Sequence, residues 1–361
     1  MEPLKILHIL GSPTDYYSYN LSVMYAGAFS PDMGGGKYSF TYAIVRPNGS
    51  WSFADDLSGV TMIKSPEQIE SDTNDDSTEI TAALQHIKFV IKPDLALVHF
   101  ECYKGMTAYW SLFDVLDIPL IGGSTESRYF TMDKLKTRTN VLGNKKIPCA
   151  EGFVYNKGDA LMLEEITFPC VVKASRGEDS KAVRLARDKK SLLEAIDHAL
   201  TYSDRVIVER FIQGREIRCA VVESVKSGEL TPLSCIEYKV PHDDIRSTDY
   251  KLTINEKGLP LGKSPRTESW FVDPTKEEDL VNRIRKYSCQ AFVDMDIKDF
   301  GTFDFRVDRH GNPYFLECNL FCSFGKQSLL NILAKDSNFT DEGLFDLMVE
   351  NALLRRNNHK G

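Results

Sequence analysis

Residues 301–319 restrict the fold most strongly, because two runs of alternating apolar and polar residues flank a polar tip that contains Gly311. This pattern is typical of a β-hairpin. If the loop consists of His310 and Gly311 alone, Asp304 lies directly opposite Glu317 on the ladder. We therefore expect an antiparallel sheet in the C-terminal part of the chain.

The same register places Thr302 opposite Asn319, with all four side chains on one face of the hairpin. Two carboxylates opposed in this way repel unless a positive charge lies between them. Carboxylate and amide oxygens are ligands that Mg²⁺ accepts. The hairpin therefore predicts a magnesium site made by Asp304, Glu317 and Asn319. The alternative is that Asp304 pairs with Arg306 while Glu317 is a solvated edge residue.

The length and net charge of the chain restrict the classes of protein to which it can belong. The chain has 361 residues, which suggests two or three domains. Its net charge of −8 argues against nucleic acid as a partner. No apolar run approaches the length of a membrane span, and the first residues lack a signal-peptide pattern. We expect a cytoplasmic protein with no membrane partner.

The order of strand and helix signals predicts an α/β (α+β) fold with three domains. Short apolar strands separated by helical or polar stretches indicate a parallel unit over residues 1–123. A helix over 131–142 begins a smaller α+β unit over 124–204. Residues 205–361 then contain further strands, which include 206–211, 216–223 and 230–239, a helix over 276–293, and the hairpin.

Two glutamates lie at the neighbouring ends of the strands predicted over 206–211 and 216–223. If these strands pair, their backbone groups suit the edge of an adenine, and Glu209 and Glu216 suit a ribose diol. The alternative is that both glutamates are solvated edge residues.

Lys173 ends an apolar strand and precedes a polar loop that contains Gly177. A strand, a cation and a flexible loop in this order suit phosphate binding by charge and backbone amides. The alternative is a strand-end lysine that reaches into water. Lys134, on the helix predicted over 131–142, has the same two interpretations.

These motifs, in this order, resemble the ATP-grasp superfamily and, within it, the D-alanine–D-alanine ligase-like branch. The resemblance runs from about residue 90 to residue 335. It implies an ATP-grasp fold in which ATP lies between the central and C-terminal domains, with Mg²⁺ as the second cofactor. The residues that it assigns to the nucleotide are Lys134, Lys173, Glu209, Arg210, Phe211, Ile212 and Glu216. Those that it assigns to magnesium are Asp304, Glu317 and Asn319.

The same resemblance implies two further site residues. Lys251 matches a lysine that closes over the phosphates, and Ser328 matches a hydroxyl that holds the carboxylate of the second amino acid. Both are the predicted catalytic residues.

Several positions depart from the D-alanine enzymes. Thr302 stands where those enzymes carry an arginine, and Tyr16 and Tyr17 stand in the loop that supplies a glutamate to the first substrate. These changes favour a larger, flatter first substrate. Residues 5–12 and 321–328 are similar to the mycosporine-glycine amino-acid ligases. The main functional prediction is therefore ATP-dependent condensation of a serine-like or threonine-like amino acid with mycosporine-glycine, through a phosphorylated intermediate.

Other functions stay open at this point. One alternative is a D-alanine–D-alanine ligase or a related dipeptide ligase. Further alternatives are a small-molecule kinase and an ATP-binding protein without turnover. In each ligase the partners are small molecules, namely an amino acid and a cyclohexenone-type or amino-acid acceptor. A homodimer is compatible with the sequence.

Overall fold

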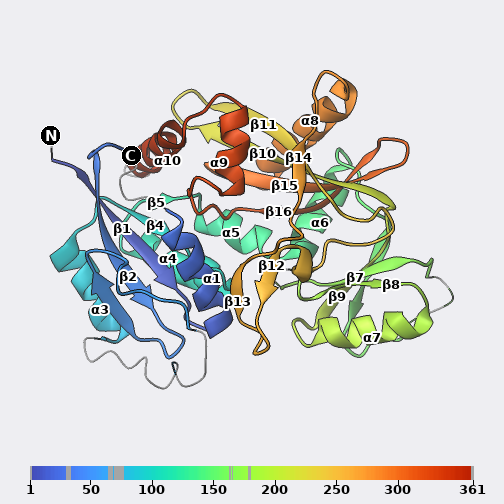
Figure 1. The fold of residues 1–361 in the computed structure, drawn as a ribbon, viewed down its shortest axis with the longest axis horizontal. Coiled ribbons are helices and arrows are strands. Elements are labelled where there is room, and N and C mark those ends of the chain that lie inside the picture. Colours follow the sequence, from blue (N-terminus) through green and yellow to red (C-terminus); the bar gives the residue numbers. More distant parts are fainter. Residues whose placement is uncertain are drawn as a thin grey trace.

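The computed structural model describes residues 2–29, 34–63, 68, 77–161, 164, 166–177 and 180–358. Over these residues the chain forms three larger sheets and one separate hairpin. Figure 1 shows the first sheet and the second sheet at opposite sides of the view, with the third sheet between and above them. No helix among the described residues is long and apolar enough to cross a membrane.

The first sheet, called the N-terminal sheet below, has the order β3-β2-β1-β4-β5. Its strands β1, β2, β4 and β5 are parallel, as predicted, and β3 is an antiparallel edge strand that the sequence did not indicate. The bounds are β1 (Leu4–Gly11), β2 (Tyr38–Val45), β3 (Trp51–Ala54), β4 (Leu95–Val98) and β5 (Leu120–Ile121). The helices of this unit are α1 (Tyr16–Gly27), α3 (Ile80–His86) and α4 (Trp110–Val115).

The second sheet, called the central sheet, has the order β6-β9-β7-β8 and is antiparallel. Its strands are β6 (Gly152–Asn156), β7 (Cys170–Ala174), β8 (Val183–Ala186) and β9 (Arg205–Arg210). Helix α7 (Lys189–Leu200) covers one face, because Leu192 and Ile196 pack against Val206 and Val208 of β9.

The position of β9 corrects two sequence-based expectations. Because β9 pairs with β6 and β7, the predicted domain boundary at residue 204 cuts through the central sheet. Strands 206–211 and 216–223 also do not pair with each other, since the second of them belongs to another sheet. The chain crosses between the two sheets over residues 211–213.

The third sheet, called the C-terminal sheet, has the order β14-β11-β10-β15-β16 and is antiparallel, as predicted. Its strands are β10 (Gly214–Ser224), β11 (Glu229–Tyr238), β14 (Ser269–Phe271), β15 (Phe300–Asp308) and β16 (Pro313–Asn319). Helix α8 (Glu278–Asp294) packs on the face that carries Phe303 and Phe305, whose side chains are fully buried. The opposite face is left for polar side chains and for helices α9 (Leu329–Asp336) and α10 (Asp341–Asn358).

The helix predicted over 131–142 corresponds to α6 (Lys134–Asn144), and a break at residues 132–133 separates α6 from a further helix, α5 (Thr125–Thr131). Asp133 causes the break, because its carboxylate accepts from the backbone amides of Leu135 and Lys136 and caps α6. Lys134 is therefore the first residue of α6.

A separate hairpin of β12 (Leu252–Ile254) and β13 (Pro260–Lys263) lies between α1 and the central sheet in Figure 1. Leu252 packs against Tyr17 and Leu21 of α1. This contact holds the segment that carries Lys251 against the N-terminal unit.

Candidate active site

The β15–β16 hairpin brings the predicted magnesium ligands to one face. Asp304 pairs with Glu317, and Thr302 pairs with Asn319, as the sequence predicts. The side chain of Asp304 is buried and that of Glu317 is one-third exposed. Asn319 is exposed at the end of β16, and its side-chain oxygen accepts from the amide of Phe321 at 2.8 Å.

The loop of this hairpin differs from the expected two residues. β15 ends at Asp308 and β16 begins at Pro313, and the Asp308 amide donates to the Asn312 carbonyl at 3.0 Å. The longer loop shifts the pairing by one residue at the tip. A β-bulge between Asp304 and Phe305 shifts it back, so the predicted pairing is recovered at the carboxylates.

Arg218 on β10 is a site residue that the sequence reasoning missed. It lies across the ladder from Asp304, and its Nε and Nη2 both donate to that carboxylate. Asp304 therefore pairs with Arg218 and not with Arg306, the alternative partner considered from the sequence. The signal was present, because strand alternation places Arg218 on the same face as Glu216.

Lys134 extends from the start of α6 to the hairpin. Its Nζ lies 3.6 Å from Oε2 of Glu317 and donates to the carbonyl of Gly177 at 2.7 Å. Its side chain is 18% exposed, which does not fit a lysine that simply reaches into water. Lys134 thus links α6, the loop after β7 and the β15–β16 hairpin.

Glu317 is held in its charged form. Burial alone would raise its pKa, but the positive charges of Lys134, Lys251 and Lys173 outweigh burial and lower the pKa to about 2. The carboxylate is therefore ionised at neutral pH and available as a ligand for a cation.

Lys173 and Glu209 form an ion pair between the neighbouring strands β7 and β9. Nη1 of Arg138 lies 3.3 Å from the same carboxylate, and its Nη2 donates to the carbonyl of Ala150. The side chains of Lys173 and Glu209 are 12% and 8% exposed. Neither residue is the solvated surface group that the alternative interpretation required.

Glu216 is also buried, on the polar face of β10. Nη1 of Arg246 lies 3.9 Å from its Oε1, and Nη1 of Arg306 lies 3.7 Å from its Oε2. Burial and the nearby charge of Asp304 raise the pKa of Glu216, although these cations oppose the shift. Two arginines therefore lie close to this buried carboxylate.

Lys251 belongs to the same cluster of charges, because its positive charge acts on the carboxylate of Glu317. Its Nζ donates to the hydroxyl of Ser180 at 2.7 Å, which joins the β12 segment to the loop before β8. Burial lowers the pKa of Lys251, and the carboxylate of Glu317 opposes this only in part.

Residues 210–212 connect the central and C-terminal sheets. The amides of Arg210 and Phe211 donate to the carbonyls of Glu151 and Pro169, and the Ile212 carbonyl accepts from Nε of Arg306 at 3.0 Å. Phe211 and Ile212 are buried, while Arg210 is exposed. This segment is an apolar link between the two sheets, with several backbone groups engaged.

Ser328 takes a structural position at the start of α9. Its hydroxyl accepts from the amide of Asn331 and donates to Oδ1 of Asn331 at 2.7 Å. Its hydroxyl also lies 3.6 Å from Sγ of Cys322, so the side-chain contacts described for Ser328 stay within the segment that follows β16.

Tyr16 and Tyr17, which favoured a flat first substrate in the sequence, both lie on α1. Tyr17 is 9% exposed and packs against Leu21 and Leu252, and Nζ of Lys181 lies 2.9 Å from its ring centroid. Tyr16 packs against Tyr19 within α1. The ring of Tyr17 is therefore engaged in packing, whereas the ring of Tyr16 is only partly buried.

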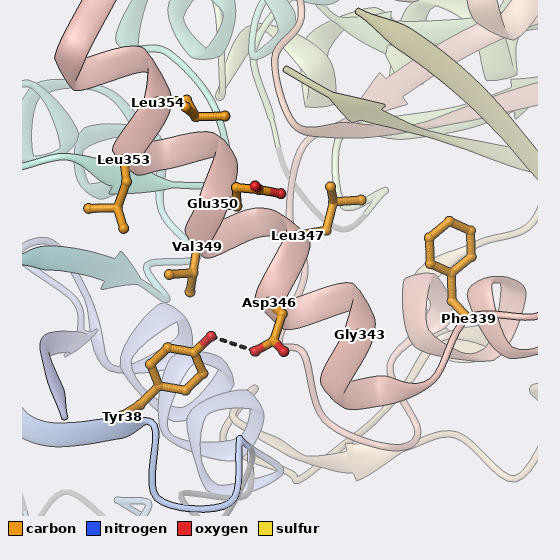
Figure 2. A pocket seen from close by; sticks show the side chains of 9 residues that line it. All are labelled: Tyr38, Phe339, Gly343, Asp346, Leu347, Val349, Glu350, Leu353 and Leu354. Carbon is orange, nitrogen blue, oxygen red and sulfur yellow. Dashed lines mark hydrogen bonds between the residues drawn. The ribbon is translucent and has the colours of Figure 1, made fainter. Parts of the chain in front are cut away.

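A separate groove of about 630 Å³ lies beside α10 (Figure 2). Apolar side chains such as Leu347 and Leu353 line it, and Oδ1 of Asp346 accepts from the Tyr38 hydroxyl at 2.5 Å. No predicted site residue lines this groove.

The donor set around the hairpin fits magnesium and a polyphosphate. Among the described residues, no group of three or more His, Cys, Asp or Glu side chains gathers as a metal site. The hairpin instead offers two carboxylates and one amide, which leaves coordination positions for phosphate oxygens. The cations that meet at this point are Lys134, Lys173, Arg218 and Lys251.

Comparison with known proteins identifies the class. The family model described as D-ala D-ala ligase C-terminus matches residues 154–350, more than half of the chain, and the chain belongs to this family. It is thus an ADP-forming ATP-grasp ligase that uses ATP and Mg²⁺, as predicted.

Individual relatives agree with this assignment. The chain is 28% identical over 261 residues to a D-alanine–D-alanine ligase of Aquifex aeolicus. The aligned residues make up 72% of this chain and 82% of that protein. It is 27% identical over 255 residues to a D-alanine–D-alanine ligase of Ruminiclostridium cellulolyticum, with 68% of this chain and 64% of that protein covered.

The fold of the chain is similar to that of solved D-alanine–D-alanine ligases. The structure of the D-alanine–D-alanine ligase from Coxiella burnetii superposes with a TM-score of 0.77 at 18% identity, and covers 100% of this chain and 97% of that one. This likeness confirms the predicted ATP-grasp fold.

Proposed function

We propose that the chain joins an amine to an acceptor activated by ATP, and that it is a dipeptide ligase of the D-alanine–D-alanine type. The observation that carries the proposal is the pair of opposed carboxylates, Asp304 and Glu317, surrounded by cations from four segments. The names of the relatives supply D-alanine as the first substrate to test.

Residues of α6, the central sheet and the C-terminal sheet bind different parts of the nucleotide. Lys134 and Lys173 bind phosphate oxygens from the central side, and Glu216 binds the ribose hydroxyls. Residues 210–212 lie against the base. Their burial supports these roles, since a charge in a partly dry site interacts more strongly than one in water.

The metal ligands in this proposal are Asp304, Glu317 and Asn319. These residues would hold magnesium, which would supply neutralisation of the negative charge of the phosphates. The low pKa of Glu317 keeps the ligand charged over the whole neutral range. Lys251 adds a further positive charge, and Ser328 stays the predicted contact for the second amino acid.

The reaction then proceeds in two steps. A carboxylate oxygen of the acceptor attacks the terminal phosphorus and ADP leaves. The amine nitrogen attacks the acyl carbon, the bond to phosphate breaks, and the amine releases a proton. The chain supplies positioning and neutralisation of charge for both steps.

Mycosporine-glycine is the second candidate acceptor. Thr302, a neutral residue beside the metal carboxylates, favours it, because an enol oxygen on a conjugated ring spreads developing charge over the ring. Two findings weaken the argument that led to it. Arg218 places a positive charge on Asp304, two residues along β15 from Thr302, and the ring of Tyr17 is buried. The comparisons do not extend to this substrate.

The test offers both substrate sets to the purified chain with ATP and Mg²⁺. One set is D-alanine alone, and the other is mycosporine-glycine with serine or threonine. ADP release is followed by a coupled assay and products by mass spectrometry. Formation of D-alanyl-D-alanine supports the first candidate, and an imine product that absorbs at longer wavelength supports the second. A stable phosphorylated product without a new carbon–nitrogen bond would indicate a kinase and contradict the proposal.

A further inference from the structure

The polar face of the C-terminal sheet carries an ordered row of residue pairs. Each pair has one member on β10 and one on β15, directly opposed on the ladder. In order along the strands they are Glu216 with Arg306, Arg218 with Asp304, and Ala220 with Thr302.

Two of these pairs carry an arginine, and the two arginines differ in how firmly they are held. Arg306 lies near Glu216 and donates to several backbone carbonyls, which include Ile212 at 3.0 Å and Asp244 at 2.7 Å. The hydrogen bonds described for Arg218 go to Asp304. Arg306 is therefore fixed by the backbone, while Arg218 depends on one carboxylate.

That carboxylate is also the predicted metal ligand. Arg218 uses both oxygens of Asp304 through its Nε and Nη2. A divalent cation on Asp304 would bring more positive charge to the same oxygens. The cation and the guanidinium of Arg218 would then repel each other. Metal binding and the paired geometry of Arg218 thus compete for one group.

The row also shows which anion Arg218 can reach after it leaves Asp304. Residues two apart on a strand are separated by about 6.7 Å. Arg218 lies this distance from Glu216, in the direction of Thr302, so it is one step away from the nucleoside end of the site. In the proposed function the phosphates extend from the ribose at Glu216 toward the metal residues, so the anions expected at that step are the terminal phosphates. The next pair, Ala220 and Thr302, is small and neutral and supplies no charge.

We propose that Arg218 is a catalytic residue that binds the phosphoryl group being transferred, and that it exchanges Asp304 for this group when the metal binds. This inference rests on the proposed function. A guanidinium suits the task because its planar donors match two phosphate oxygens at once, which a lysine amine cannot do.

The test measures binding, so that it does not depend on turnover. Calorimetry compares ADP with a non-hydrolysable ATP analogue, both with Mg²⁺, and separately measures Mn²⁺ without nucleotide. The variants are Arg218→Met and Arg218→Lys. Arg215→Met is the matched control, because Arg215 is also on β10 but pairs with Glu237 and Glu277.

The proposal expects two effects of opposite sign in Arg218→Met. Preference for the ATP analogue over ADP falls by about tenfold to a hundredfold, because a charge-assisted hydrogen bond to the terminal phosphate is lost. Mn²⁺ alone binds more tightly, because Asp304 is released. Arg218→Lys, which keeps a cation opposite Asp304, loses part of the preference. Arg215→Met leaves both quantities unchanged.

Other outcomes separate this inference from the proposed function. A folded Arg218→Met with the wild-type preference for the ATP analogue would overturn the role of Arg218. If Arg218→Met does not fold, a wild-type preference in Arg218→Lys would overturn it equally, because the matched donor geometry is then irrelevant. Wild-type protein that binds neither nucleotide would instead contradict the proposed function.

Discussion

Nζ of Lys134 lies 3.6 Å from Oε2 of Glu317, so the first residue of α6 meets the second strand of the β15–β16 hairpin. This contact joins the central part of the chain to the C-terminal sheet at the point where the predicted phosphate and metal residues meet. Because Lys134 carries positive charge and Glu317 negative charge, the two residues can hold a phosphate and a metal ion on opposite sides of one site.

Replacing Glu317 by glutamine tests the metal hairpin. Glu317→Gln keeps the shape of the side chain but removes one ligand charge, so we expect Mg²⁺-dependent ADP release to fall at least about a hundredfold. Glu268→Gln is the matched control, since Glu268 is exposed and pairs with Lys239 at the surface. Equal rates in Glu317→Gln and wild type would remove Glu317 from the site.

The nucleotide contacts are tested by Lys173→Ala and Glu216→Ala. Each should weaken ATP binding by about 1 to 3 kcal/mol in calorimetry, because each removes a charge-assisted hydrogen bond. Lys190→Ala changes an exposed lysine of α7 and should leave the affinity unchanged. ATP affinity at the wild-type level in both site variants would show that Lys173 and Glu216 do not bind the nucleotide.

Much of the candidate site follows from local pattern. Alternation in residues 301–319 was sufficient to place Asp304 and Glu317 on the polar face of the hairpin, because one strand face must be apolar and the other polar. Their direct pairing was derived from an assumed loop of two residues. The loop length was not predictable in the same way. The bulge beside Asp304 compensates for the longer loop, and nothing in the alternation requires such a bulge.

Features that depend on tertiary structure could not be predicted from the sequence. The sequence suggests that residues 206–211 pair with 216–223, because they are neighbours joined by a turn at Gly214. The structure places them in different sheets, since β9 buries Val206 and Val208 against α7. The break between α5 and α6 was visible in principle, because Asp133 is a strong capping residue.

Asp299 joins the N-terminal and C-terminal parts of the chain. Its Oδ2 accepts from the amides of Gly122 and Gly123 at 2.9 and 3.1 Å, and its carboxylate pairs with Arg355. Asp299→Asn should lower the free energy of unfolding by about 3 kcal/mol, because the buried side chain loses its charge beside Arg355. Urea denaturation measures this.

Asp296→Asn provides the control for that measurement. Asp296 has a positive φ, like Asp299, but its side chain is 70% exposed and pairs with Lys298 at the surface. We expect a change within about 0.5 kcal/mol. Equal losses of stability in the two variants would show that the buried pair does not explain the effect.

Two buried histidines link the N-terminal sheet to the segment after β16. Nε2 of His8 lies 2.7 Å from Nδ1 of His99, and Nε2 of His99 lies 3.0 Å from the carbonyl of Cys322. Since a carbonyl only accepts, His99 carries its proton on Nε2 and accepts from His8. Both rings are neutral in this arrangement.

Burial lowers the pKa of His99 from 6.5 to about 4. Between these values the unfolded chain binds the proton more strongly, so stability is full above pH 6.5 and falls as the pH drops toward 4, by up to about 3 kcal/mol. Denaturation at pH 7 and pH 5 should show a smaller loss in His99→Gln than in wild type. His310→Gln, at an exposed loop position, should keep the wild-type dependence on pH.

Isotope transfer tests the central claim most directly. The acceptor carboxylate of D-alanine is labelled with a heavy isotope of oxygen, and the phosphate released with ATP and Mg²⁺ is analysed by mass spectrometry. If the carboxylate takes the phosphoryl group and an amine then displaces it, each released phosphate carries one labelled oxygen, and D-alanyl-D-alanine accumulates in equal amount. Release of unlabelled phosphate, with ADP formed and no new carbon–nitrogen bond, would contradict the account.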